Sequence, residues 1–121
     1  MARRKPKQRP ARLKAPTSEY GDPAGNTLTL RGSLTPATRR QYAEVRASGG
    51  RAADTREDTW QRAVEFLFEH LAVRWEIAGS PIERQRELLA RFRAASASER
   101  AWIRDALREH CAEHFPDVQA P

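Results

Sequence analysis

The sequence predicts a mainly α protein: a small helical bundle with a long central helix and a C-terminal αα-hairpin, preceded by a short β-hairpin and a disordered basic N-terminal arm. Three observations lead to this fold class. Residues 55–78 contain neither glycine nor proline, Ser80 and Ser96 each precede a glutamate by three residues, and all three lysines lie among the first 16 residues. With 121 residues, of which 39% are hydrophobic, the chain fits one small domain.

The first 16 residues carry seven cations and no acid. The whole chain has 22 Lys and Arg against 16 Asp and Glu, a net charge of +6, so residues 17–121 hold 15 cations and 16 acids, a net charge of −1. Prolines and charge repulsion in this segment disfavour a packed structure. We expect a disordered arm that contacts the phosphates of nucleic acid, with a solubilising tail or an acidic protein partner as the alternatives. The cations expected to contact nucleic acid are Arg3, Arg4, Lys5, Lys7, Arg9, Arg12 and Lys14.

Residues 17–35 are expected to form an extended segment or a short hairpin. The stretch 21–26 is rich in turn-forming residues, and the stretch 27–30 alternates polar and apolar side chains, as a half-buried strand does. Tyr20 can begin the partner strand. The pattern therefore favours a hairpin over about residues 18–30 that leans on the helices, with an unpaired strap as the alternative.

The next expected element is a short helix over about residues 36–47. Thr35 can cap its first turn, and Pro36 has the backbone angle that the first helical position needs. Two glycines after Ser48 end the helix, so residues 48–54 are expected to form a connection.

The central helix is expected over residues 55–78 and is the predicted hub of the core. Thr55 is the expected N-cap, and Gly79 the residue that follows the last turn. At 100° per residue, the apolar side chains form one wide stripe on this helix. A stripe this wide needs several neighbours, and we expect a second copy of the chain to cover part of it in a homodimer. The stripe consists of Trp60, Val64, Phe66, Leu67, Phe68, Leu71, Val73, Trp75, Ile77 and Ala78.

Two further helices are expected over residues 81–95 and 97–114, joined by a short turn as an αα-hairpin. Ser80 and Ser96 are the expected N-caps, and the glutamate three residues after each completes a capping box. Acidic residues on the second helix argue against a helix-turn-helix motif for DNA. The expected organisation is therefore a basic arm (1–16), an extended segment or hairpin (17–35), a helical domain (36–116) and a tail (117–121).

Five polar side chains are expected on the apolar faces of these helices. If the faces meet, these side chains form a polar cluster in the core, either as a pocket or pH-sensitive contact or as groups satisfied by the backbone and by packing. Two of the histidines are four residues apart on one helix, a spacing that suits a metal, but no second ligand pair exists. We therefore predict no metal site and no cofactor. The members of the cluster are His70, Arg74, Gln85, His110 and His114.

The sequence favours a binding function over catalysis, because it contains no glycine-rich phosphate loop, nucleophile elbow or paired carboxylates in an apolar setting. We predict a small non-enzymatic protein that contacts nucleic acid through its basic arm. The alternative is a protein–protein adaptor or small subunit that docks through its helical face, with the arm on an acidic partner. No apolar run approaches the roughly 20 residues of a membrane span, and no apolar segment follows the arm, so a cytoplasmic location without a membrane partner is expected.

Overall fold

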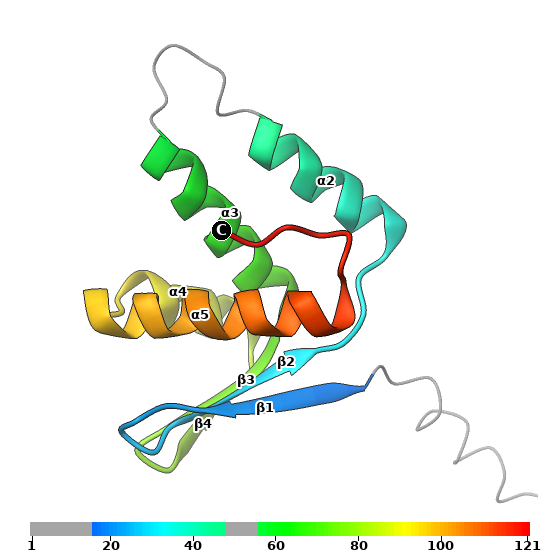
Figure 1. Cartoon of the computed structure of the whole chain (residues 1–121). Coiled ribbons are helices and arrows are strands. Elements are labelled where there is room, and N and C mark those ends of the chain that lie inside the picture. Colours follow the sequence, from blue (N-terminus) through cyan, green and yellow to red (C-terminus); the bar gives the residue numbers. More distant parts are fainter. Residues whose placement is uncertain (1–15, 48–55) are drawn as a thin grey trace, which may run out of the picture.

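The computed structural model describes residues 16–47 and 56–121, which form a sheet with helices packed on one of its faces (Figure 1). Predictions for the seven cations of the arm, for the connection over 48–54 and for a cap at Thr55 lie outside the described residues. The elements in chain order are β1 (Thr17–Gly21), β2 (Thr27–Arg31), α2 (Pro36–Ala47), α3 (Arg56–Leu71), β3 (Ala72–Ile77), β4 (Ser80–Ile82), α4 (Gln85–Arg93) and α5 (Ala97–His114).

The sheet is an antiparallel meander with the strand order β1-β2-β3-β4, and α2 and α3 are inserted between its two central strands. Tyr20, Leu28, Trp75 and Ile82 lie opposite one another across the four strands. This row is on the face that the helices cover, because Trp75 packs against α3 and Tyr20 against α5. The alternation of strand side chains therefore places apolar groups inside and polar groups on the open face.

The prediction of a mainly α bundle is wrong. The helix expected over 55–78 ends at Leu71, and the residues that follow form β3 within a four-stranded sheet. Trp75 lies four residues after Leu71, a spacing that fits a helix, and two residues from both Val73 and Ile77, a spacing that fits a strand. Apolar spacing alone does not separate these two structures, and pairing with β2 decides in favour of the strand.

A two-residue turn explains the second correction, which concerns the helix expected over 81–95. Ala78 and Gly79 have positive φ angles of 51° and 81° and connect β3 directly to β4. Two residues of positive φ are typical of the tight turns that join antiparallel strands. Ser80 therefore pairs with Ile77 in the sheet rather than capping a helix, and α4 begins later, after Arg84 and without a side-chain cap.

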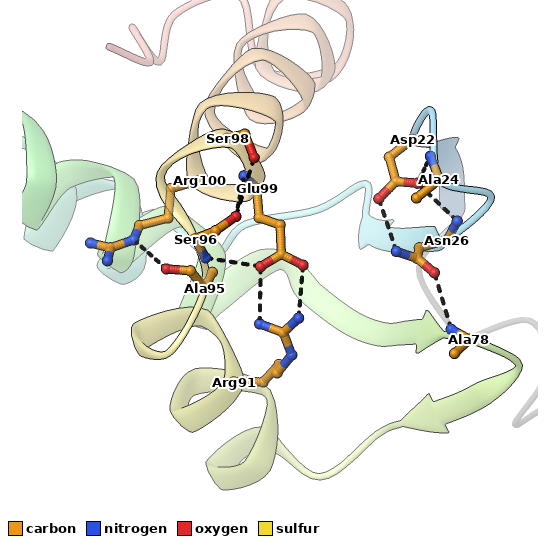
Figure 2. Close-up of polar contacts among 10 residues, drawn as sticks. All are labelled: Asp22, Ala24, Asn26, Ala78, Arg91, Ala95, Ser96, Ser98, Glu99 and Arg100. Carbon is orange, nitrogen blue, oxygen red and sulfur yellow. Dashed lines mark hydrogen bonds and ion pairs between the residues drawn. The ribbon is translucent and has the colours of Figure 1, made fainter.

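Three local predictions are confirmed. β1 and β2 pair along their whole length, so the hairpin forms, as one half of a larger sheet. The helix α2 begins at Pro36, and the Thr35 hydroxyl accepts a hydrogen bond from the Thr38 N–H at 3.1 Å. Ser96 and Glu99 form the expected capping box at the start of α5 (Figure 2).

The core lies between the covered face of the sheet and the helices α3, α4 and α5. Phe68 of α3 is fully buried, stacked on Phe92 at a centroid distance of 4.7 Å and edge-on to Trp75 at 5.7 Å. The chain itself thus covers Phe68, and Val73 and Ile77 belong to a strand. Most of the helical stripe from which the homodimer was predicted is therefore covered or belongs to a strand, and among the described residues Trp60 is its one large exposed member.

The last residues of the chain fold back against α2 and α5 (Figure 1). Val118 is buried, and the Tyr42 hydroxyl donates a hydrogen bond of 2.6 Å to the Gln119 carbonyl oxygen. Arg39 forms an ion pair with Asp117 at 2.9 Å. This part of the α2 surface is consequently occupied by the chain's own tail.

Candidate nucleic-acid interface

A groove of about 860 Å³ lies between α3, the end of α4 and the first half of α5. Its floor includes the buried side chains of Val64 and Phe92, and its walls carry several arginines and one tryptophan. An apolar floor with charged walls can hold a ligand that is flat and apolar at its centre and anionic at its edges. The lining residues are Arg56, Glu57, Trp60, Gln61, Val64, Glu65, Phe92, Arg93, Ala97, Arg100, Ala101 and Arg104.

Helical periodicity aligns these side chains along the groove. On α3, Arg56, Trp60 and Val64 follow one another at four-residue intervals and therefore share one side of the helix. On α5, two alanines and two arginines recur at the same interval, and the small alanines leave space beside the cations. These four residues are Ala97, Ala101, Arg100 and Arg104.

Trp60 does not lie in the core, where the apolar stripe had placed it. Its exposed fraction is 43%, and among the described residues it is the one large apolar side chain that is exposed. The helix α3 begins far from the sheet and runs toward it (Figure 1). Thr59 and Ala63 in its first turns are buried, so this part of the helix packs through those residues and leaves Trp60 exposed. The sequence does carry a signal for this exposure, because Trp60 is surrounded by polar residues such as Arg56, Glu57 and Gln61.

Positive charge dominates the groove. Four arginines face two glutamates, and both glutamates already have partners. Glu65 forms an ion pair with Arg93, and Glu57 accepts a hydrogen bond from Gln61 at 3.4 Å. The groove therefore has a net charge of +2 in a chain whose residues 17–121 sum to −1.

Three of the groove arginines have no carboxylate partner among the described residues: Arg56, Arg100 and Arg104. The Arg104 Nε is enclosed and has no hydrogen-bond partner in the same part of the chain. An enclosed donor without a partner costs free energy. The other N–H groups of the Arg104 guanidinium have no carboxylate partner in the described residues either and can bind an anion in the groove. The groove is thus prepared for a negatively charged ligand.

Glu99 lies next to Arg100 in the chain but does not neutralise it. Arg91 donates hydrogen bonds of 3.3 and 2.7 Å to the two carboxylate oxygens, and the Ser96 N–H donates a third of 2.9 Å. The Arg91 guanidinium, and to a smaller extent the Ser96 N–H, lower the pKa of Glu99, so this carboxylate stays ionised and paired. The Arg100 side chain points away from it and donates to the Ala95 carbonyl oxygen at 3.2 Å (Figure 2).

Of the five polar side chains predicted to cluster, the structure brings together His110 and His114, whose ring centroids are 4.4 Å apart on α5. The other three lie elsewhere. His70 packs on an aromatic ring of its own helix at 4.2 Å, and Arg74 lies on the open face of the sheet, paired with two glutamates at 3.0 Å. Gln85 is exposed and donates to a carbonyl oxygen of α3.

His110 is fully buried and joins α5 to the first hairpin. Its Nε2–H donates to the Arg31 carbonyl oxygen at 2.8 Å, which leaves Nδ1 as the acceptor of the Tyr20 hydroxyl, also at 2.8 Å. Ser18 and His114 form a further hydrogen bond of 3.2 Å nearby. Burial lowers the pKa of His110, so the neutral ring is favoured. Both ring nitrogens are occupied, which is the pattern of a structural histidine.

The part of the chain that the structure describes contains no group of three or more His, Cys, Asp or Glu residues that could hold a metal ion. Cys111 is buried, and burial raises the pKa of its thiol to about 11, so it is protonated and unreactive at neutral pH. In the same residues no helix is long and apolar enough to cross a membrane. The chain matches no family model, no curated protein and no solved structure, so its function must be inferred from its own residues.

Proposed function

We propose that this protein binds nucleic acid in the cytoplasm without catalysing a reaction, and that the groove and the basic arm both contact phosphates. The observation that carries the proposal is the groove, where Arg56 from α3 and Arg100 and Arg104 from α5 lack carboxylate partners beside the exposed Trp60. A guanidinium matches the geometry of a phosphate and binds it with paired hydrogen bonds.

The distribution of charge supports the same proposal. The first 16 residues hold seven cations, and the groove has a net charge of +2, whereas residues 17–121 together are slightly acidic. Positive charge is thus gathered in the arm and in the groove, and the hollow between α2 and the C-terminal tail, with three arginines and one aspartate, is a further cationic place. Such concentration is the electrostatic feature expected of a protein that binds a phosphate backbone.

A second hollow contains three arginines, of which Arg39 and Arg46 have partners among the described residues, whereas Arg40 has no carboxylate partner there. The hollow lies between α2 and the C-terminal tail, with a volume of about 580 Å³. There, Arg39 is paired with Asp117, and Arg46 donates to the Gln119 carbonyl oxygen at 2.6 Å. An anion would have to displace these contacts at two of the three arginines, whereas the groove offers three arginines without carboxylate partners among the described residues and is therefore the better site.

Binding to fluorescently labelled RNA and DNA, both single-stranded and duplex, tests the proposal. We expect affinity that falls steeply with salt in the full-length protein. Replacing both Arg56 and Arg100 by Gln should weaken binding and reduce the log–log salt slope on single strands by about 1.4, because two phosphate contacts are lost. The matched control replaces Arg31 and Arg86 by Gln, since both are exposed, lie outside the groove and carry the same charge.

Equal losses in the groove variant and in the control would show that net charge alone matters, and would contradict a site at the groove. Binding that is unaffected by either pair would contradict it as well. Polyglutamate serves as a competitor with carboxylates in place of phosphates and bases. If it displaced nucleic acid as effectively as unlabelled nucleic acid does, an acidic protein would be the better partner.

A further inference from the structure

Resting on the proposed function, we infer that the groove is a site for single-stranded nucleic acid, in which the Trp60 indole stacks on an unpaired base while the arginines hold the neighbouring phosphates. Trp60 and the arginines line one continuous groove of about 860 Å³. This volume lies toward the upper end of the range of about 300–1,000 Å³ for small-molecule pockets, so the groove can accept a nucleotide with its neighbours.

The exposure of Trp60 points to an aromatic partner. The indole is 43% exposed, whereas the other large apolar side chains of the described residues are buried or partly buried. Every base offers a flat π face, and stacking on it would remove apolar surface of the indole from water. In a duplex, the neighbouring base pairs cover both faces of each base. A base that can stack on Trp60 must therefore be unpaired.

The arrangement of the cations fits a strand that passes over Trp60. Arg56 lies one turn before Trp60 on α3, and Arg100 and Arg104 face it from α5. Guanidinium groups are thus available on two walls, as the phosphates before and after a stacked base require. The buried floor residues Val64 and Phe92 offer no hydrogen-bonding groups to a base edge. We therefore expect little preference among base sequences.

An abasic oligonucleotide separates stacking from charge, because it carries the phosphates without the bases. With oligothymidylate as the ligand, Trp60→Leu should weaken binding about tenfold, whereas Trp60→Phe should retain most of the affinity. With an abasic strand of the same length, both variants should bind as the wild type does. The wild type should also bind the single strand more tightly than a duplex with the same number of phosphates.

The outcomes distinguish failure of this inference from failure of the proposed function. If Trp60→Leu has no effect on oligothymidylate, or the same effect on the abasic strand, stacking is excluded. If the Arg56 and Arg100 variant still weakens binding in that case, the groove binds phosphates and the proposed function stands. If neither variant weakens binding, the groove is excluded as a site, which overturns this inference and the groove's part in the proposed function and leaves the arm as the remaining site. Sedimentation adds a further check, because a wild-type dimer that Trp60→Leu converts to a monomer would assign the indole to a protein interface and overturn the inference.

Discussion

Two tryptophans show how strongly the surroundings of a residue decide its energetic role. Trp75 is 1% exposed, contacts Phe68 edge-on at 5.7 Å and has the Arg91 guanidinium 5.1 Å from its ring centroid. Trp75→Ala should lower the free energy of unfolding by about 3–5 kcal/mol, because it empties a packed site. Trp60→Ala should change it by about 0.5 kcal/mol or less. Urea denaturation followed by circular dichroism measures both values, and comparable losses would place Trp60 in the core.

The buried His110 makes stability depend on pH. Burial, assisted by the nearby His114, lowers its pKa below the ordinary value of 6.5, whereas the Arg31 carbonyl oxygen and Glu113 oppose this shift. The unfolded chain therefore takes up a proton more readily than the folded one. The stabilisation by the neutral ring is complete above about pH 6.5 and is lost as the pH falls through that value toward the lower pKa of the folded state.

A comparison of wild type with His110→Gln isolates this effect, because all other titrating groups are common to both proteins. The difference between their free energies of unfolding should be largest at pH 8 and should shrink toward pH 5. Urea denaturation at several pH values measures it. A difference that stays constant over this range would mean that His110 keeps an ordinary pKa.

The sequence placed His110 and His114 on an inner helix face but could not supply their partners. The Tyr20 hydroxyl and the Arg31 carbonyl oxygen belong to strands that are 90 and 79 positions away from His110. Helical periodicity describes one element, and these contacts arise only when two elements pack. The exposure of Trp60 was not predicted for a related reason. An apolar stripe shows which residues share one side of a helix, but not which of them the neighbouring elements cover.

At the scale of elements, the predicted helix starts were correct where the local residue pattern is typical of a helix start and of no other structure. Thr35 before Pro36, and Ser96 before Glu99, mark real helix starts. The prediction was wrong between residues 72 and 82, where the same residue pattern is compatible with a helix and its end or with two strands joined by a tight turn. Glycine follows helices and also occupies tight strand turns, and the positive φ of Ala78 beside it was not visible in the sequence.

The two serine–glutamate pairs give a direct test of this distinction. Ser96→Ala should lower the free energy of unfolding by about 1 kcal/mol, because its hydroxyl oxygen accepts the Glu99 N–H at 3.1 Å. Ser80→Ala should change it by about 0.5 kcal/mol or less, because Ser80 is an exposed strand residue. Thermal unfolding of the two variants in parallel compares them. A larger loss for Ser80→Ala would restore the helix start predicted at that position.

At the scale of the whole molecule, the four-stranded sheet changes which apolar side chains require cover from a second copy of the chain. The predicted homodimer depended on a wide stripe of ten residues along one helix, and six of these lie in α3 whereas three belong to β3. Phe66 is partly buried against Tyr42 at a centroid distance of 5.9 Å. Among the described residues Trp60 is the one large exposed member of the stripe, so a homodimer that uses this stripe would have to form through the groove. Sedimentation velocity at micromolar concentration is the measurement that decides it.

Charge at this scale is divided between the arm and the groove, and removal of the arm separates their contributions. A chain that starts at Pro16 keeps the hydrogen bond next to the first strand pair, in which the Gly32 N–H donates to the Pro16 carbonyl oxygen at 2.7 Å. Its thermal unfolding should match that of the full chain. Its affinity for duplex should fall sharply, since seven cations that neutralise about six phosphates contribute roughly −5 to the log–log salt slope.

The remaining affinity of the truncated protein is the informative quantity. Three groove arginines without carboxylate partners should still hold a single strand weakly, so replacing Arg56 and Arg100 by Gln should weaken the truncated protein further. The two losses should add if the arm and the groove contact different phosphates of one ligand, because distant sites act independently. Fluorescence anisotropy over a salt series measures both. Equal binding by the truncated and full-length proteins would remove the arm from the interface, and a truncated protein insensitive to the groove variant would remove the groove.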